Sequence, residues 1–374
     1  MADIGSLRPQ SNGGFEADPA RGWTLPADWY IDPAVYAAEC EAVFGRAWHW
    51  AGHVSRVAKP GDYITPRVMD QNLIVIRGLD GELRGFHNVC KHRAHELLSG
   101  QGRTRAIVCP YHAWAYDIDG SLRSARHSES VEDFDAAAFC LSPVRVEVFC
   151  GFVFVSLDAD ARPLAEAAPE LAAEVEHFAP DVGELMHARR LHFDLAANWK
   201  VVVDNFLECY HCPPTHPAFV DLVEMDKYKV TTYGIHSSHM SVGRPGSNAA
   251  YETEGAQLMD HAVWWLWPNT CFLRFPGGPN FFVLNILPAG PERTLETLDF
   301  HFLEPEPDAA QEEAIRYFAE VLQPEDITIV ESVQRGLHSK VYDRGRFMVD
   351  ADRSSWSEHG VHHFHGLLHQ ALAG

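Results

Sequence analysis

The sequence predicts an α+β protein of two domains, in which a small antiparallel β-domain precedes a larger domain of mixed helices and strands. The length of 374 residues is typical of two domains. Short β-branched and aromatic runs divided by turns fill residues 48–157, whereas helical spacing alternates with strand patterns over residues 158–374. We expect residues 1–47 to form a polar tail and one helix that packs on the larger domain.

The N-terminal helix has clear start and stop signals. Residues 1–22 are polar and rich in Gly and Pro, which predicts a tail. Asp32-Pro33 then begins a helix, because proline is favoured in the first turn, and Gly45 ends it. One face of this helix is expected to carry Val35, Tyr36, Cys40, Val43 and Phe44.

The other elements follow from local patterns. In the β-domain, strands are expected at Tyr63-Ile64, Leu73–Ile76, Ile107-Val108 and Phe152–Val155, with turns at Pro60-Gly61, Asp80-Gly81 and Asp119-Gly120. Residues 158–188 are expected to be helical, with breaks at Pro163 and Pro169. Further helices are expected around residues 198–212, 308–322, 324–340 and 356–372, and strands around residues 229–243 and 262–304.

The chain is strongly acidic, with a formal net charge of −22. Nucleic-acid binding needs a basic surface, and anionic membranes attract basic segments, so we expect neither partner. The sequence shows no signal-peptide pattern, no twin-arginine signal and no apolar run of about 18 residues. We therefore expect a cytoplasmic protein.

The chain has eight cysteines, too few for a disulfide scaffold of this length. Two of them, Cys90 and Cys109, belong to a motif described next. We expect the other six to be reduced core thiols: Cys40, Cys140, Cys150, Cys209, Cys212 and Cys271.

Two short motifs pair cysteine with histidine, Cys90-Lys91-His92 and Cys109-Pro110-Tyr111-His112. Two thiolates and two imidazoles suit a [2Fe–2S] cluster in which histidines replace cysteines on one iron. Neutral imidazole raises the reduction potential of such a cluster, which makes it an electron relay. The pattern C-x-H followed by C-x-x-H resembles the Rieske iron–sulfur domain. A structural zinc site is the alternative, but C-x-H spacing is unusual for zinc.

A second group of metal-binding side chains begins at residue 208. Glu208 and His211 are expected to share a helix face, and Pro213-Pro214 is expected to break that helix so that His216 folds back beside His211. Two histidines and one carboxylate form the facial triad of non-haem Fe(II) oxygenases. Cys209 and Cys212 have a zinc or redox spacing, but no second ligand pair follows them.

The carboxylate of this triad must come from a later element. Pro324-Glu325-Asp326 is expected to begin a helix, and Asp326 could project from its first turn. Glu325 and Glu331 compete with Asp326 for this role, although both could simply lie on a solvated helix face.

The order and separation of the two groups resemble the catalytic subunit of Rieske non-haem iron oxygenases over nearly the whole chain. The resemblance implies a Rieske domain followed by a catalytic domain with a helix-covered antiparallel sheet. It implies that Cys90, His92, Cys109 and His112 hold the [2Fe–2S] cluster, and that His211, His216 and Asp326 hold mononuclear Fe(II). It also implies a homotrimer in which Glu208 bridges His211 to a cluster-ligand histidine of the neighbouring subunit.

Glu208 stands where many aromatic-ring dioxygenases have Asp. This glutamate is similar to the branch that oxidises quaternary ammonium compounds, such as carnitine, betaine and choline oxygenases. Three flanking segments are similar to that branch too: Asn88–Cys90, His95–Leu98 and Glu331–Leu337.

A quaternary ammonium group binds well over aromatic faces by cation–π attraction. Trp265 and Trp267 would point to one side of a strand, and Phe272–Phe275 and Phe281-Phe282 supply more rings. Such aromatic strands are more often core than binding site. Arg274 could pair with a substrate carboxylate or form an ordinary strand-edge salt bridge.

We therefore predict an O2-dependent monooxygenase that acts on a small quaternary ammonium compound by N-demethylation or C–N cleavage. The sequence has no G-x-G-x-x-G fingerprint for a nicotinamide or flavin, so a separate flavin/iron–sulfur reductase is expected to supply electrons. The alternatives are an aromatic-ring hydroxylating oxygenase, a Rieske electron-transfer protein and a zinc-stabilised interaction protein.

Overall fold

The computed structural model describes residues 14–373, except for 247–250, 252, 254–255 and 257–258. The first thirteen residues of the predicted tail lie outside the described residues. The chain divides into two compact units, one of residues 45–164 and one of residues 1–44 with 165–374. The domain limits expected at residues 48 and 157 fall a few residues inside the smaller unit.

The smaller unit is an antiparallel β-structure, as the sequence predicts. Its main sheet has the order β1-β11-β10-β5-β4-β2-β6, with β3 beside β4, and β7-β8-β9 form a second sheet. Gly120 closes a predicted turn at φ +91°, where a Cβ atom would lie 2.5 Å from the Phe86 ring. The strands are β1 (Trp48–His53), β2 (Asp62–Ile64), β3 (Arg67–Val68), β4 (Gln71–Arg77), β5 (Leu83–His87), β6 (Gln101–Arg103), β7 (Ile107–Val108), β8 (Ala115–Tyr116), β9 (Leu122–Ser124), β10 (Pro143–Phe149) and β11 (Phe152–Ser156).

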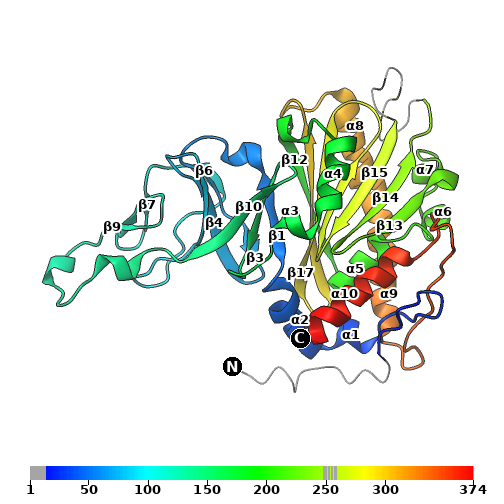
Figure 1. The fold of residues 1–374 in the computed structure, drawn as a ribbon, viewed down its shortest axis with the longest axis horizontal. Helices are drawn as coiled ribbons and strands as arrows, with labels where there is room; N and C mark the ends of the chain where they lie inside the picture. The colour runs from blue at the N-terminus through cyan, green and yellow to red at the C-terminus, as the bar shows by residue number, and fades with distance from the viewer. Residues whose placement is uncertain (1–13, 247–250, 252, 254–255, 257–258, 374) are drawn as a thin grey trace. The chain divides into compact units, whose positions relative to one another are not determined.

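The larger unit contains a seven-stranded antiparallel sheet in the order β12-β18-β17-β16-β15-β14-β13, with helices on both faces (Figure 1). The strands are β12 (Met186–Leu195), β13 (Lys229–Thr232), β14 (His236–Val242), β15 (Asp260–Leu266), β16 (Thr270–Arg274), β17 (Asn280–Gly290) and β18 (Arg293–Phe302). The helices are α1 (Asp28–Ile31), α2 (Pro33–Glu39), α3 (Leu164–Ala167), α4 (Pro169–Phe178), α5 (Trp199–Phe206), α6 (Cys212–Thr215), α7 (Pro217–Val220), α8 (Ala309–Tyr317), α9 (Gln323–Leu337) and α10 (His359–Ala373).

Adjacent residues on β15 show which helices cover which face. Trp264 donates a hydrogen bond from Nε1 to the Glu174 carboxylate of α4 at 2.8 Å. The ring of Trp265 packs edge-on against Phe364 of α10, with centroids 5.4 Å apart. Successive strand residues point to opposite faces, so α4 and α10 cover opposite faces of the sheet.

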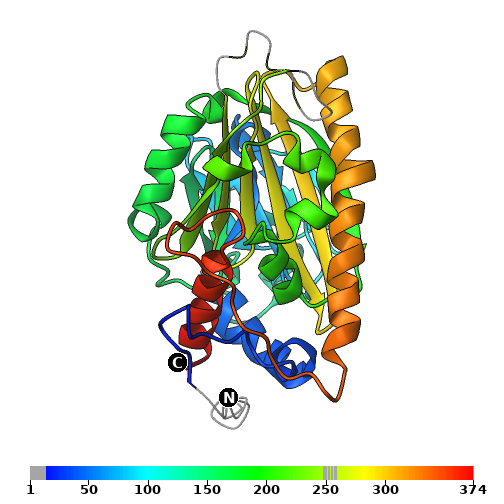
Figure 2. The same cartoon turned by 90° about the vertical axis from the view of Figure 1, so that its right-hand side faces the viewer.

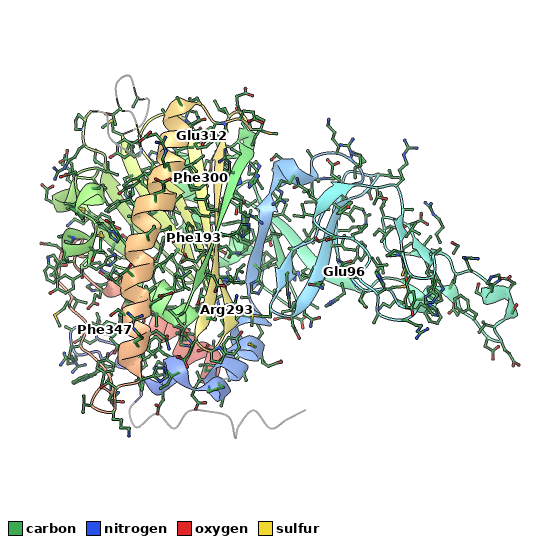
Figure 3. The ribbon with its side chains drawn as sticks, turned by 180° about the vertical axis from the view of Figure 1, so that it is seen from behind. Glu96, Phe193, Arg293, Phe300, Glu312 and Phe347 are labelled. Atoms are coloured by element: carbon green, nitrogen blue, oxygen red, sulfur yellow. A yellow bond between two sulfur atoms is a disulfide. The ribbon has the colours of Figure 1, made fainter. Side chains whose placement is uncertain are left out.

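One long helical run lies along the sheet (Figure 2). It comprises α8, the π-helix η8 (Phe318–Leu322) and α9 without a break between them. The sequence analysis expected two helices divided at Pro324. Instead, the wider π-turn precedes the proline and accommodates its ring, so the chain stays helical. Phe318 in the π-turn packs on Phe300 of β18, which Figure 3 labels beside the run.

Three other local predictions were wrong. The helical region expected to reach residue 188 ends earlier, because β12 begins at Met186 and pairs with β18. The helix expected over 198–212 ends at Phe206. Pro213 and Pro214 lie in the first turn of α6, where proline is tolerated, and so begin a short helix instead of breaking one.

The described part of the chain contains no helix long and apolar enough to cross a bilayer.

The predicted N-terminal helix is confirmed as α2, which a π-helix (Cys40–Phe44) continues, and Asp32 caps its start. Its Glu39 forms an ion pair with Lys200 of α5, with Oε1 and Nζ 2.6 Å apart and both side chains fully buried. Glu39 also accepts a hydrogen bond from Trp199 Nε1 at 2.8 Å. This pair links the helix to the segment that leads into the site described next.

Removing Lys200 alone should destabilise the protein strongly, because Glu39 would remain as an uncompensated buried charge. We expect Lys200→Met to cost about 3–5 kcal/mol and the double variant Glu39→Gln/Lys200→Met to cost clearly less. Lys227→Met, which breaks the exposed pair with Glu224, is the control and should cost at most about 1 kcal/mol. Thermal melting of the four proteins checks this; equal melting of the two single variants would contradict it.

Candidate active site

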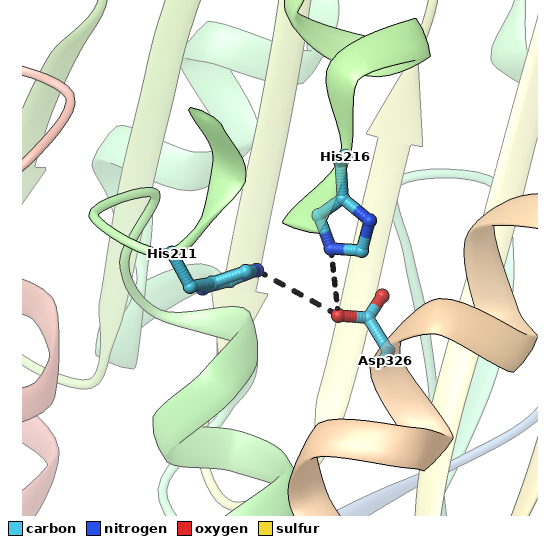
Figure 4. A group of neighbouring side chains, drawn as sticks. All are labelled: His211, His216 and Asp326. Carbon is cyan, nitrogen blue, oxygen red and sulfur yellow. Dashed lines mark hydrogen bonds and ion pairs between the residues drawn. The ribbon is translucent and has the colours of Figure 1, made fainter. Parts of the chain in front are cut away.

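Three side chains able to bind a metal converge in the larger unit, and they are His211, His216 and Asp326 (Figure 4). Oδ1 of Asp326 lies 3.0 Å from Nε2 of His216 and 3.6 Å from Nε2 of His211. One ligand atom from each residue lies within 4.8 Å of the other two. The structure thus brings together the three residues that the sequence analysis singled out as a facial triad.

Two short helices and the start of α9 position the three side chains. After α5 ends, the chain bends, and His211 lies just before α6, while His216 lies between α6 and α7. Asp326 stands in the first turn of α9, immediately after the π-turn. Glu208 and His211 therefore lie in a bend and not on the helix face that the sequence predicted.

Each imidazole is held from behind by a carboxylate. Nδ1 of His211 donates to Oε1 of Glu208 at 2.6 Å, and Nδ1 of His216 donates to Oε2 of Glu325 at 2.7 Å. Such carboxylate–histidine pairs fix the ring orientation and leave Nε2 free for a metal.

The electrostatics of the site favour positive charge. Burial opposes the charged form of His216, but Asp326 and Glu325 outweigh burial and raise the pKa of this imidazole. The same two carboxylates would stabilise a bound cation. The donor set of two imidazoles and one carboxylate fits Fe(II) with coordination positions left open.

The structure distinguishes the three acidic residues that the sequence analysis compared in α9. Asp326 joins the triad, Glu325 holds His216, and Glu331 accepts a hydrogen bond from the backbone of Ala196 at 3.0 Å. Sequence reasoning also missed Asn205, whose Nδ2 lies 3.4 Å from Nε2 of His211. Asn205 lies six residues before His211, a spacing that does not predict a contact between the two side chains.

The expectation that Cys209 and Cys212 are reduced was wrong. The structure joins them in a disulfide, and both residues are buried. The bend that carries His211 brings the two Cα atoms to 4.9 Å, within disulfide range. The remaining cysteines among the described residues form no disulfide.

A cavity of about 110 Å³ borders the triad. The sheet contributes His261, Val263, Leu273 and Glu296, and rings line it from several elements: Phe206, Phe219, Tyr228, Phe275 and Phe318. Three of its lining residues are acidic, Glu208, Glu296 and Asp326, and none is Lys or Arg. Burial lowers the pKa of His261 to about 3, so its imidazole is neutral.

Of the aromatic and basic residues considered from the sequence, Phe275 lines the cavity, whereas Trp265, Trp267 and Arg274 do not. The rings of Trp265 and Trp267 are neighbours, as strand alternation predicts, but both pack on Phe364 and neither lines the cavity. Leu273 pairs with Val263 in the sheet, and both line the cavity. Arg274 is the next residue and pairs with Ala262, so its side chain points to the opposite face, away from the cavity. Its Nη1 instead donates to the carbonyl oxygen of Gly278 at 3.1 Å.

The smaller unit holds two loops of the same construction. Cys90 accepts a backbone hydrogen bond from Ala94, and Cys109 accepts one from Ala113. Both alanines adopt left-handed backbone, with φ of 58° and 59°. The repeated geometry presents one cysteine and one histidine from each loop.

The four side chains of these loops lie side by side in a way that suits a cluster. Cys90 and Cys109 are buried, free thiols, and the rings of His92 and His112 have centroids 4.6 Å apart. Nδ1 of His112 is buried and lacks a hydrogen-bond partner among the described residues. His92 stacks on Trp114 at 4.9 Å. Two inner thiols and two outer imidazoles fit a [2Fe–2S] cluster with histidines on one iron.

Together the two sites have the donor sets of an iron–sulfur electron relay and of a mononuclear non-haem iron centre. Comparison with known families agrees with this class. Residues 47–135 match the family model of the Rieske [2Fe-2S] domain. Residues 182–374 match the model of the ring hydroxylating alpha subunit, catalytic domain.

Individual relatives cover nearly the whole chain. The carnitine monooxygenase oxygenase subunit of Escherichia coli (strain K12) is 40% identical over 96% of both chains. The chloroplastic choline monooxygenase of Arabidopsis thaliana is 31% identical over 94% of this chain and 83% of that protein. The crystal structure of the quaternary ammonium Rieske monooxygenase CntA with L-carnitine matches with a TM-score of 0.87, at 40% identity over 96% of this chain and 97% of that one.

A more distant structure, naphthalene 1,2-dioxygenase from Rhodococcus sp., has a TM-score of 0.79 at 22% identity over 93% of this chain and 94% of that one, and shares the fold. The chain therefore belongs to the Rieske oxygenases, in the ring hydroxylating alpha-subunit family. It is an oxidoreductase with a Rieske [2Fe–2S] cluster and a mononuclear iron, and it depends on a reductase for electrons.

Glu325 supplies a prediction about metal affinity. Glu325→Ala should weaken binding of the mononuclear iron about 10–100-fold, because His216 would lose its orienting partner. Iron retention during titration with a chelator measures the effect, and cluster absorbance should not change. Glu320→Ala, at an exposed position of the same helical run, is the matched control. Equal iron retention in the two variants would disprove the orienting role.

Proposed function

We propose that this enzyme is the oxygenase component of a Rieske non-haem iron system that monooxygenates a small quaternary ammonium compound, such as carnitine or a betaine. The observation that carries the proposal is the cavity beside the triad. It offers aromatic faces and carboxylates but no Lys or Arg side chain, which suits a cation. The likeness to carnitine and choline monooxygenases supports the same substrate class.

In this proposal His211, His216 and Asp326 bind the mononuclear iron, and Cys90, His92, Cys109 and His112 bind the cluster. Held by these residues, the iron would supply O2 activation and the cluster would supply electrons one at a time. Glu208 and Glu325 keep the two imidazoles oriented, while Phe275 and the other cavity rings exclude water and hold the substrate near the triad. The substrate itself does not coordinate the metal.

The overall reaction explains the expected products. One C–H bond beside the quaternary nitrogen becomes C–OH, and the second oxygen atom of O2 leaves as water with two electrons from the reductase and two protons. The carbinol then loses its hydroxyl proton as the C–N bond breaks, and nitrogen keeps the electron pair. A carbonyl compound and a tertiary amine result, which amounts to N-demethylation or C–N cleavage.

We further propose a homotrimer, in the cytoplasm, in which electrons cross between subunits through Glu208. Glu208 is in contact with His211, and a second cavity of about 410 Å³ reaches both residues. Tyr210 and Trp356 are large, exposed rings whose centroids lie 6.5 Å apart close to this point. Exposed aromatic side chains favour a protein interface.

The substrate class is tested by reductase-coupled O2 uptake with betaines, carnitine, choline and simple aromatic acids. We expect uptake with an ammonium compound, together with formaldehyde or an amine such as trimethylamine. Iron analysis should give about three iron ions per chain, two of them in the cluster. A hydroxylated aromatic product, with no uptake on any ammonium compound, would move the enzyme to the ring-hydroxylating reaction.

Glu208→Ala tests the electron path. Loss of the hydrogen bond to His211 should weaken iron binding, so the variant is reconstituted with excess iron until analysis shows both metal centres loaded. Turnover should still stop because the cluster cannot pass its electron to the iron. The readout is rapid reoxidation of a pre-reduced cluster by O2 and substrate, which the variant should lose. Asp221→Ala, at an exposed position, is the control. Turnover at the wild-type rate by Glu208→Ala would refute the bridge.

A further inference from the structure

Glu296 is a buried carboxyl group of the cavity with no assigned task. It lies on β18, is 3% exposed and lines the cavity beside the triad. Its Oε2 is buried and has no hydrogen-bond partner among the described residues. The other two acids of the lining are occupied, because Glu208 holds His211 and Asp326 belongs to the triad.

The neighbours of Glu296 do not compensate its charge. Ile286 and Phe193 lie directly opposite it on the adjacent strands. Burial raises the pKa of the Cys271 thiol, and the nearby Glu296 carboxylate raises it further. Burial and then the Asp326 carboxylate raise the pKa of Glu296 itself to about 8. A carboxyl group in such a place is costly to ionise unless a cation joins it.

The shape and lining of the cavity indicate which cation fits. A quaternary nitrogen has no N–H to donate, so it needs a nearby charge and aromatic faces instead of hydrogen-bond acceptors in fixed directions. Phe219, Tyr228 and Phe275 line the part of the cavity around His261 of β15, and Glu296 supplies a free carboxyl group to the same cavity from β18. Among the described residues, the groups arranged to bind a single metal ion are only those of the triad, so a second metal does not explain Glu296.

We propose that Glu296 binds the positive charge of the substrate and thereby makes the cavity select quaternary ammonium groups over neutral groups of the same shape. This inference rests on the proposed function and adds the residue that determines charge specificity. Glu296 faces the cavity from the sheet, while the triad faces it from the helices. A substrate held between them presents its N-methyl carbons to the metal side.

The test compares choline with 3,3-dimethylbutan-1-ol, in which a carbon atom replaces the charged nitrogen. Binding is measured by calorimetry on the iron-loaded enzyme without reductase. Wild-type enzyme should bind choline at least about tenfold more tightly than the neutral alcohol. Glu296→Gln, which keeps the shape and removes the charge, should weaken choline binding by about tenfold or more and leave binding of the alcohol unchanged or stronger.

Glu304→Gln, an exposed carboxylate just beyond β18, is the matched control and should change neither affinity. Two results would overturn the inference: equal affinity of wild-type enzyme for the two ligands, or an equal loss of both in Glu296→Gln. The first comparison needs no variant and therefore holds even if the substitution impairs folding. Cation preference without turnover of any ammonium compound would refute the proposed function and leave the role of Glu296 standing.

Discussion

Two short hydrogen bonds between imidazole and carboxylate are the constraint on which the active site depends. Glu208 and Glu325 hold the Nδ1 atoms of His211 and His216, so both Nε2 atoms face Asp326. Without these bonds the two histidines, which lie in short irregular segments, could rotate. The carboxylates come from different elements, one from the bend after α5 and one from the start of α9.

Motifs with local spacing could be predicted from the sequence, and contacts between distant segments could not. Cys90 and His92 are two residues apart, so one loop must present both. Glu325 was treated as a rival of Asp326, because adjacent carboxylates cannot be told apart until the phase of the helix is known. Glu296 gave no signal at all, since strand alternation assigns it a face but does not say which face borders the cavity.

The predicted fold class is confirmed, and the local predictions that were wrong have a common cause. The helical prediction ran to residue 188, three residues into β12, where pairing with β18 about a hundred residues later makes the chain a strand. The disulfide of Cys209 and Cys212 likewise depends on how the chain bends after Phe206. In each case, tertiary contacts decide between local conformations that the sequence alone leaves nearly equal.

The π-turn of Phe318–Leu322 gives the active site an unusual dependence on chain length. A regular α-helix turns by about 100° per residue, so a π-turn, which holds one extra residue, resets the angular phase of everything that follows it. Glu325, Asp326 and Val330 face the site only in that phase. The five residues of the π-turn bind no metal themselves, but they set the direction in which Asp326 points. A family member that lost one of these residues would need its carboxylate ligand at another position of the helix.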